Sequence, residues 1–108
     1  MPFVTIRRKE DALTDGSEGT LSALCDLLEE KLPSIVGMGG GIEFDTPFFD
    51  KSARHVPDVR VEVEGHAYLE RDEDRIASQL RTAIDSSGIV PEDVLLQIAV
   101  KLPRLGVA

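Results

Sequence analysis

Two short segments with apolar residues at every second position are the clearest pattern in this chain. They cover residues 2–7 and 57–63, are rich in valine and isoleucine, and begin with Pro2 and Pro57. Strict alternation of this kind predicts β-strands with one buried face. Because each segment leads through a polar stretch into a helical pattern, the chain has the form of a tandem repeat.

The two helical patterns have apolar residues three or four positions apart, which is typical of helices that bury one side. The first pattern predicts a helix over about 19–32, ended by Pro33. The second predicts a helix over about 73–87. Asp72 suits its N-cap, and Gly88 suits its C-terminal stop.

Each helix is followed by a further predicted strand, over 42–49 in the first half and over 93–101 in the second. The run 94–100 is almost continuously apolar, as expected of a strand buried on both faces. The chain is therefore expected to be one domain, 1–108, of two β-α-β units.

These units span about 2–50 and 57–103, and two folds share their element order. In a split βαβ (ferredoxin-like) fold, another strand lies between the two strands of each unit. In the alternative, each unit keeps its strands adjacent and parallel, and the halves pair about a pseudo-twofold axis. The proline-led strand in both halves favours the alternative.

Composition limits the classes of function. The 108 residues carry 20 acidic and 12 basic side chains, a net charge of −8, which opposes binding to nucleic acid or anionic membranes. We see no apolar run long enough for a membrane span and no secretory signal, so we expect a cytoplasmic protein.

The cysteine and histidine side chains suggest no reactive site. We expect the single cysteine, Cys25, to be a small buried apolar side chain rather than a nucleophile. His55 and His66 lack the spacing of a metal site, so we expect neither metal nor cofactor.

Pro2 is the candidate catalytic residue. Removal of Met1 would leave a secondary amine at the start of the first predicted strand. An N-terminal amine titrates near pH 7.7–8.0 in model peptides, and burial in an apolar pocket lowers the pKa of such a base. A proline amine in that setting can act as a general base near neutral pH. A Met-Pro start also occurs by chance.

With its Met-Pro start, duplicated unit and length, the chain resembles the tautomerase superfamily, whose members include 4-oxalocrotonate tautomerase and macrophage migration inhibitory factor. Segments 44–49 and 57–63 look most like a small, uncharacterised bacterial branch. The resemblance implies an α/β (two-layer α+β) fold, with a four-stranded mixed sheet and two helices on one face. It further implies a homotrimer with an active site at each subunit boundary. There the proline amine moves a proton in a small carboxylic acid, and arginines hold the carboxylate.

The expected binding residues are cations and one aromatic side chain. Arginine suits a carboxylate because its planar fork donates two hydrogen bonds. Adjacent arginines in a strand point to opposite faces, so only one of the first pair can face the site. The candidates are Arg7, Arg8, Phe49, Arg60 and Lys101. Each cation is also compatible with a solvated surface charge.

Three functions remain open from the sequence. The first is a tautomerase or isomerase that uses Pro2 as its base. The second is a non-catalytic trimeric scaffold or ligand-binding protein of the same fold, and the third is a ferredoxin-like interaction domain. A glycine-rich stretch, 37–41, lacks the lysine and hydroxyl of a phosphate loop, which indicates a connection between helix and strand.

Overall fold

The computed structural model describes residues 3–10, 12, 17–36, 42–64 and 73–101. Two strand–helix–strand units follow one another, as the repeat predicts. The elements in chain order are β1 (Phe3–Arg8), α1 (Ser17–Val36), β2 (Glu43–Asp45), β3 (Val59–Glu64), α2 (Glu73–Ser87) and β4 (Leu96–Lys101).

All four strands form one mixed sheet in the order β2-β1-β3-β4. Strands of the same unit are adjacent and parallel, whereas β1 and β3 pair antiparallel at the centre. This order distinguishes the two folds that the sequence left open, because in a ferredoxin-like sheet the strands of one unit are separated. The ferredoxin-like alternative is therefore wrong, and the pseudo-twofold arrangement is confirmed.

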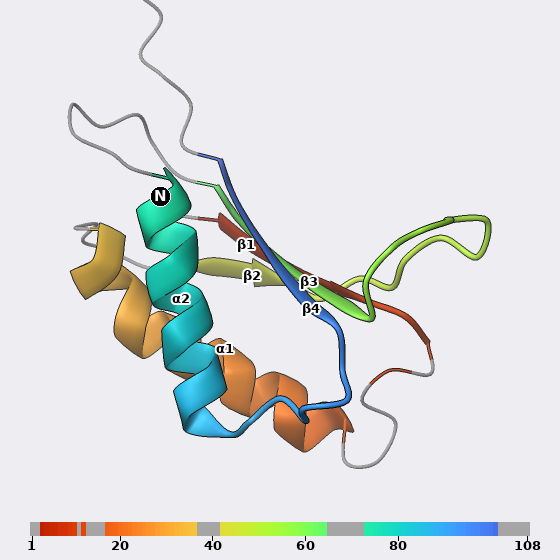
Figure 1. Cartoon of the computed structure of the whole chain (residues 1–108), viewed down its shortest axis with the longest axis horizontal. Helices are drawn as coiled ribbons and strands as arrows, with labels where there is room; N and C mark the ends of the chain where they lie inside the picture. The colour runs from red at the N-terminus through yellow and green to blue at the C-terminus, as the bar shows by residue number, and fades with distance from the viewer. Residues whose placement is uncertain (1–2, 11, 13–16, 37–41, 65–72, 102–108) are drawn as a thin grey trace, which may run out of the picture.

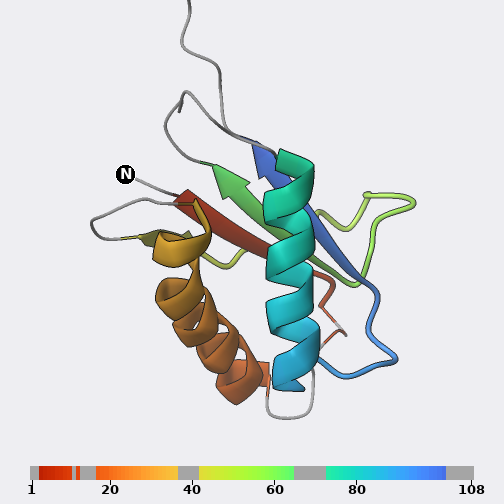
Figure 2. The ribbon, with the colours of Figure 1, turned by 60° about the vertical axis from the view of Figure 1, so that its left-hand side comes forward.

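Both helices cover the same face of the sheet (Figures 1 and 2). Alternation turns every second residue of the central strands toward them, and each helix turns its apolar side toward the sheet. The core forms where these two surfaces meet. Its fully buried members are Val4, Ile6, Leu24, Leu28, Leu32, Val59, Val61, Val63, Leu80 and Ile84.

Helix α1 continues beyond Pro33, where the sequence predicted its end. Proline removes one N–H donor, so the carbonyl of Glu29 loses its usual partner, but the three residues after proline still have N–H groups for the next carbonyls. One further turn can therefore form, and α1 ends at Val36.

Strand β2 is much shorter than the predicted 42–49. It pairs with β1 from Glu43 to Asp45, and the same register returns only at a single bridge between Arg8 and Phe48. Pro47 lies in the gap and has no N–H group to give to a ladder. Its carbonyl still accepts a hydrogen bond from the Arg8 backbone N–H at 3.2 Å.

Strand β4 begins at Leu96 rather than at residue 93, and it is not buried on both faces as predicted. Asp58 explains the start, because its carboxylate accepts the backbone N–H of Leu95 at 2.9 Å. Both helices lie on one face of the sheet, so no helix of the described part of the chain covers the other face of β4 (Figure 2). Leu95 is 68% exposed and Gln97 is also exposed.

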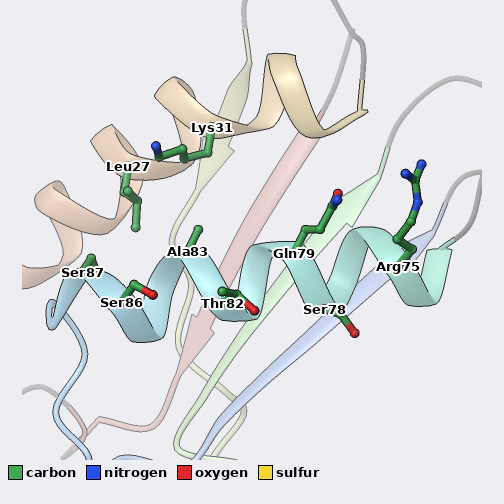
Figure 3. Close-up of a pocket in the computed structure, with 9 residues that line it drawn as sticks. All are labelled: Leu27, Lys31, Arg75, Ser78, Gln79, Thr82, Ala83, Ser86 and Ser87. Carbon is green, nitrogen blue, oxygen red and sulfur yellow. The ribbon is translucent and has the colours of Figure 1, made fainter.

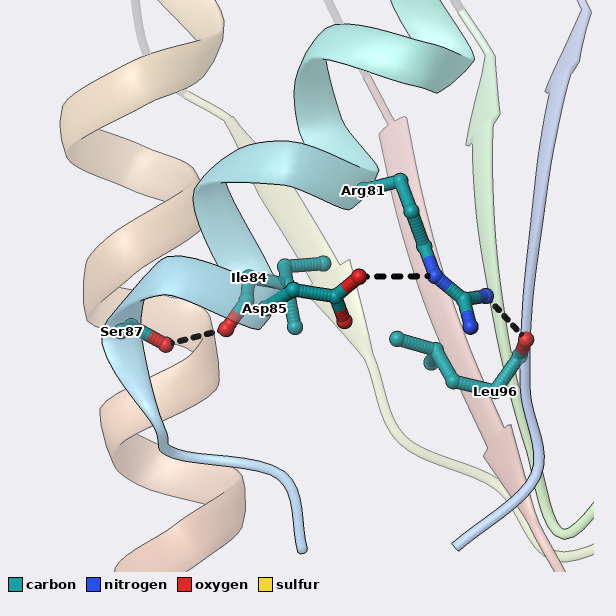
Figure 4. A network of polar contacts seen from close by, with 5 residues as sticks. All are labelled: Arg81, Ile84, Asp85, Ser87 and Leu96. Carbon is teal, nitrogen blue, oxygen red and sulfur yellow. Dashed lines mark hydrogen bonds and ion pairs between the residues drawn. The ribbon is translucent and has the colours of Figure 1, made fainter. Parts of the chain in front are cut away.

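Helix α2 matches the predicted 73–87, and Gly88 follows it with a φ of 69°, the left-handed conformation that favours glycine. A polar network joins this end of α2 to β4 (Figure 4). Arg81 donates to the Leu96 carbonyl and pairs with Asp85 at 3.3 Å. The Ser87 hydroxyl donates to the Ile84 carbonyl at 2.6 Å. These contacts fix the helix against the start of the edge strand.

The buried side of α2 provides a test of this core. Leu80 is 0% exposed, so Leu80→Ala should lower the free energy of unfolding by about 2–5 kcal/mol, through lost burial and the cavity left behind. Thr82→Ala, on the exposed side of the same helix, is the control and should change it by less than about 0.5 kcal/mol. Urea denaturation at one protein concentration measures both, and equal losses would contradict this packing.

Candidate functional site

The sheet face opposite the helices, here called the open face, carries most of the charged side chains of the strands. Strand register groups its residues into three rungs, because paired residues project to the same side. The first rung holds Glu43, Phe3, Glu64 and Lys101; the second holds Asp45, Thr5, Glu62 and Ala99; the third holds Arg7, Arg60 and Gln97. Acidic residues therefore gather near the start of β1, and the two arginines lie at its end.

Arg60 makes more contacts than the other two residues of the third rung. Its Nε donates to Oε1 of Gln97 at 2.6 Å, and its Nη1 lies 3.8 Å from Oε1 of Glu62. The same Glu62 oxygen lies 3.6 Å from Nε of Arg7. One carboxylate thus joins two guanidinium groups whose strands place them directly opposite each other.

Two adjacent phenylalanines stack on arginines from opposite sides of the sheet. The guanidinium of Arg60 lies 5.3 Å from the ring centre of Phe49, and that of Arg8 lies 4.1 Å from the ring centre of Phe48. Distances of this order are typical of cation–π contacts. Alternation puts Arg8 on the same side as Val4 and Ile6, so it does not join the open face.

The Nε atom of Arg8 is buried and has no hydrogen-bond partner in the part of the chain that the structure describes. Three of the five predicted binding residues lie close together on the open face, namely Arg7, Arg60 and Phe49. Arg8 points to the other face, as alternation requires of one member of the pair.

Lys101 lies at the opposite end of the open face. It pairs in register with Glu64, which lies opposite Phe3. Phe3 and Arg7 are four positions apart in the strand, a distance of about 13 Å. Within one subunit, Lys101 is thus near the start of β1 and the arginine pair is far from it. Pro2, the predicted base, lies outside the described residues, as does the stretch 37–41.

A hollow of about 250 Å³ lies along the open face between β3 and β4. Arg60, Glu62 and Gln97 line one part of it, and Glu64 and Lys101 line another. Glu62 and Gln97 were not among the predicted site residues. The sequence did contain a signal for both, because Glu62 is two positions from Arg60 in an alternating strand and Gln97 interrupts an apolar run.

A second hollow, of about 660 Å³, lies between the outer sides of α1 and α2 and has fewer charged side chains that face one another. Leu27 and Ala83 face each other across it, while Ser78, Thr82 and Ser86 point away from α1 (Figure 3). A third hollow of about 570 Å³ includes Arg81 and Asp85, which already bind each other. The open face is therefore the candidate site.

The described residues contain no group of three histidine, cysteine or acidic side chains suited to a metal ion. None of the helices in the same part of the chain is long and apolar enough to cross a membrane.

Cys25 is partly buried on α1, and burial raises the pKa of its thiol, with Asp26 and Glu29 adding to the effect. A thiol of this kind is protonated at neutral pH and is a poor nucleophile.

Comparison with known proteins gives the fold. No family model matches the chain, and no curated protein is significantly similar to it in sequence. Solved structures of tautomerase superfamily members do match it over nearly its whole length. The chain therefore has the fold of that superfamily.

Three of these structures illustrate the match. The FG41 malonate semialdehyde decarboxylase inhibited by 3-bromopropiolate is 14% identical, with 94% of this chain and 83% of that one aligned and a TM-score of 0.62. A symmetric trimer of fused wild-type 4-OT is 14% identical, with 98% and 91% aligned and a TM-score of 0.59. A domain of unknown function (DUF1904) from Sebaldella termitidis is 14% identical, with 95% and 89% aligned and a TM-score of 0.56.

The raised pKa of Cys25 predicts slow alkylation at neutral pH. At pH 7.5 iodoacetamide should modify the protein more slowly than N-acetylcysteine, because the raised pKa of Cys25 leaves a smaller fraction of thiolate than in a free thiol. The rate should rise as the pH passes the ordinary thiol range. Intact mass measured over time reports only this residue, since the chain has a single cysteine. Fast modification at pH 7 would mean that Cys25 is an activated thiol.

Proposed function

We propose that this protein is a cytoplasmic, cofactor-independent tautomerase or isomerase that moves a proton in a small enolisable carboxylic acid. In this proposal Pro2, freed by removal of Met1, is the general base. The observation that supports it most is the third rung. There Arg7 and Arg60 lie side by side on the open face of a tautomerase-type sheet, with Phe49 stacked on Arg60.

The arginine pair suits the carboxylate of such a substrate. Gln97 and Phe49 hold the Arg60 guanidinium from its edge and its face, so little side-chain freedom is lost when an anion binds. Arg7 adds a second positive charge directly opposite. An enol or enolate oxygen that gains charge during proton transfer is stabilised by the same cations.

The distance along β1 favours a site built from more than one subunit. Pro2 precedes Phe3, and the arginine rung is about 13 Å further along the strand. A proton-transfer base must reach its substrate within hydrogen-bond distance. We therefore propose a homotrimer in which the base of one subunit faces the arginines of another. The solved structures with this fold include trimers of fused 4-OT.

A second candidate is a non-catalytic ligand-binding protein of the same fold. The first rung favours it, because Glu43 and Glu64 flank Phe3 in register. Negative charge near an amine stabilises its protonated form and so weakens it as a base. Lys101 offsets one of these charges. In this case the arginines bind the same class of anion without turnover.

The role of Pro2 has a direct test in the ketonisation of phenylenolpyruvate. Pro2→Ala should lower kcat/KM by about 10²–10⁴, the usual contribution of a general base. Pro57→Ala, at the matching position of the second unit, cannot affect a terminal amine and is the control. Intact mass must first show that Met1 has been removed. Unchanged activity in Pro2→Ala, or a retained methionine, would eliminate Pro2 as the base.

The proposed assembly has its own measurement. Light scattering at micromolar concentration should give about three times the chain mass of 11.8 kDa, because the site needs two subunits. A stable monomer with full activity would show that the base and the arginines belong to one chain, contrary to the strand register.

A further inference from the structure

Glu62 occupies the position between the two arginines that a bound carboxylate would take. Its Oε1 lies 3.6 Å from Nε of Arg7 and 3.8 Å from Nη1 of Arg60. These lengths exceed those of hydrogen bonds between charged groups, which are about 2.7–2.9 Å. Glu62 therefore offsets one of the two positive charges without using the short, directional bonds that an arginine fork can give to a ligand.

The charges around the site determine which anions it favours. Arg7 and Arg60 contribute two positive charges, and Glu62 removes one. Further along the hollow, Glu64 and Lys101 lie opposite each other and balance. Arg7, Arg60 and Glu62 together keep a single positive charge, which matches one carboxylate. The other acidic residues of the open face, Glu43 and Asp45, add negative charge that opposes a second one.

The size of the hollow agrees with a small ligand. Its volume of about 250 Å³ is below the roughly 300–1,000 Å³ of most small-molecule pockets. A carboxylic acid with a few carbon atoms fits this volume. A second carboxylate on so short a molecule would lie near Glu62, which lines this hollow, whereas Glu64 is balanced by Lys101 opposite it.

We propose that Glu62 is a specificity-determining residue that makes the arginine pair selective for small monocarboxylates over dicarboxylates. This inference rests on the proposed function, because it concerns the group that would hold the substrate carboxylate. It does not depend on Pro2 and can be measured without turnover.

Crotonate and fumarate are suitable probes, because they have the same four carbons and the same double bond but one and two carboxylates. Binding is followed by NMR titration of the wild type and Glu62→Gln, which removes the charge and keeps the shape. The wild type should prefer crotonate. Glu62→Gln should bind crotonate about threefold and fumarate about tenfold more tightly, because the relieved repulsion scales with ligand charge.

Two further variants separate the role of Glu62 from general charge and from folding. Glu64→Gln removes a charge from the same strand and face, and it should change either affinity by less than about twofold. Glu62→Asp keeps the charge and should keep the preference for crotonate. Amide spectra of the unliganded variants show whether each is folded, and Glu62→Asp carries the test if Glu62→Gln is not.

The outcomes are distinct. Equal effects of Glu62→Gln and Glu64→Gln, unchanged or weaker fumarate binding by Glu62→Gln, loss of the preference in Glu62→Asp, or no binding of either probe by any variant would each overturn the inference. If the affinities change as expected but Pro2→Ala has no effect on turnover, the inference holds and the proposed catalysis fails.

Discussion

The antiparallel pairing of β1 with β3 is the contact on which the rest of this structure depends. It joins two units that each contain only a parallel strand pair and a helix, and it creates the continuous surface on which both helices pack. It also places Arg7 directly opposite Arg60. Like charges in this position destabilise a sheet. This repulsion is offset by the Glu62 carboxylate, the Gln97 amide and the Phe49 ring. The contacts of the candidate site therefore also stabilise the pairing of β1 with β3.

Much of the fold could be predicted from periodicity, because the core consists of residues whose spacing matches their element. Alternation located β1 and β3, and the three-to-four spacing located α2 to the residue. The errors lie where a backbone or tertiary contact overrides the local pattern. Pro47 interrupts β2 by lacking an N–H group, and Asp58 captures the Leu95 N–H ahead of β4. The apolar run of β4 indicated burial on both faces, but the pattern of one strand does not show that both helices lie on the same side of the sheet.

The candidate site was less accessible to sequence reasoning. Arg7, Arg60 and Phe49 could be proposed by residue type, but their proximity depends on the register between strands far apart in the chain. Lys101 illustrates the limit, since its charge suited a carboxylate yet register places it at the other end of the face. Glu62 was not predicted as a site residue, because an acidic side chain indicates a role in anion binding only when its position between two cations is known.

The interruption of β2 has a consequence for how this surface can change. Phe49 is attached to β1 by its own hydrogen bond, from its backbone N–H to the Arg8 carbonyl at 2.9 Å. The segment beyond it extends away from the helices (Figure 1), and most of its residues from 50 to 55 are exposed. Its length and composition can therefore vary without any cost to the core. Phe49 is thus held on the sheet beside Arg60, while the loop that follows it can change without moving this aromatic side chain.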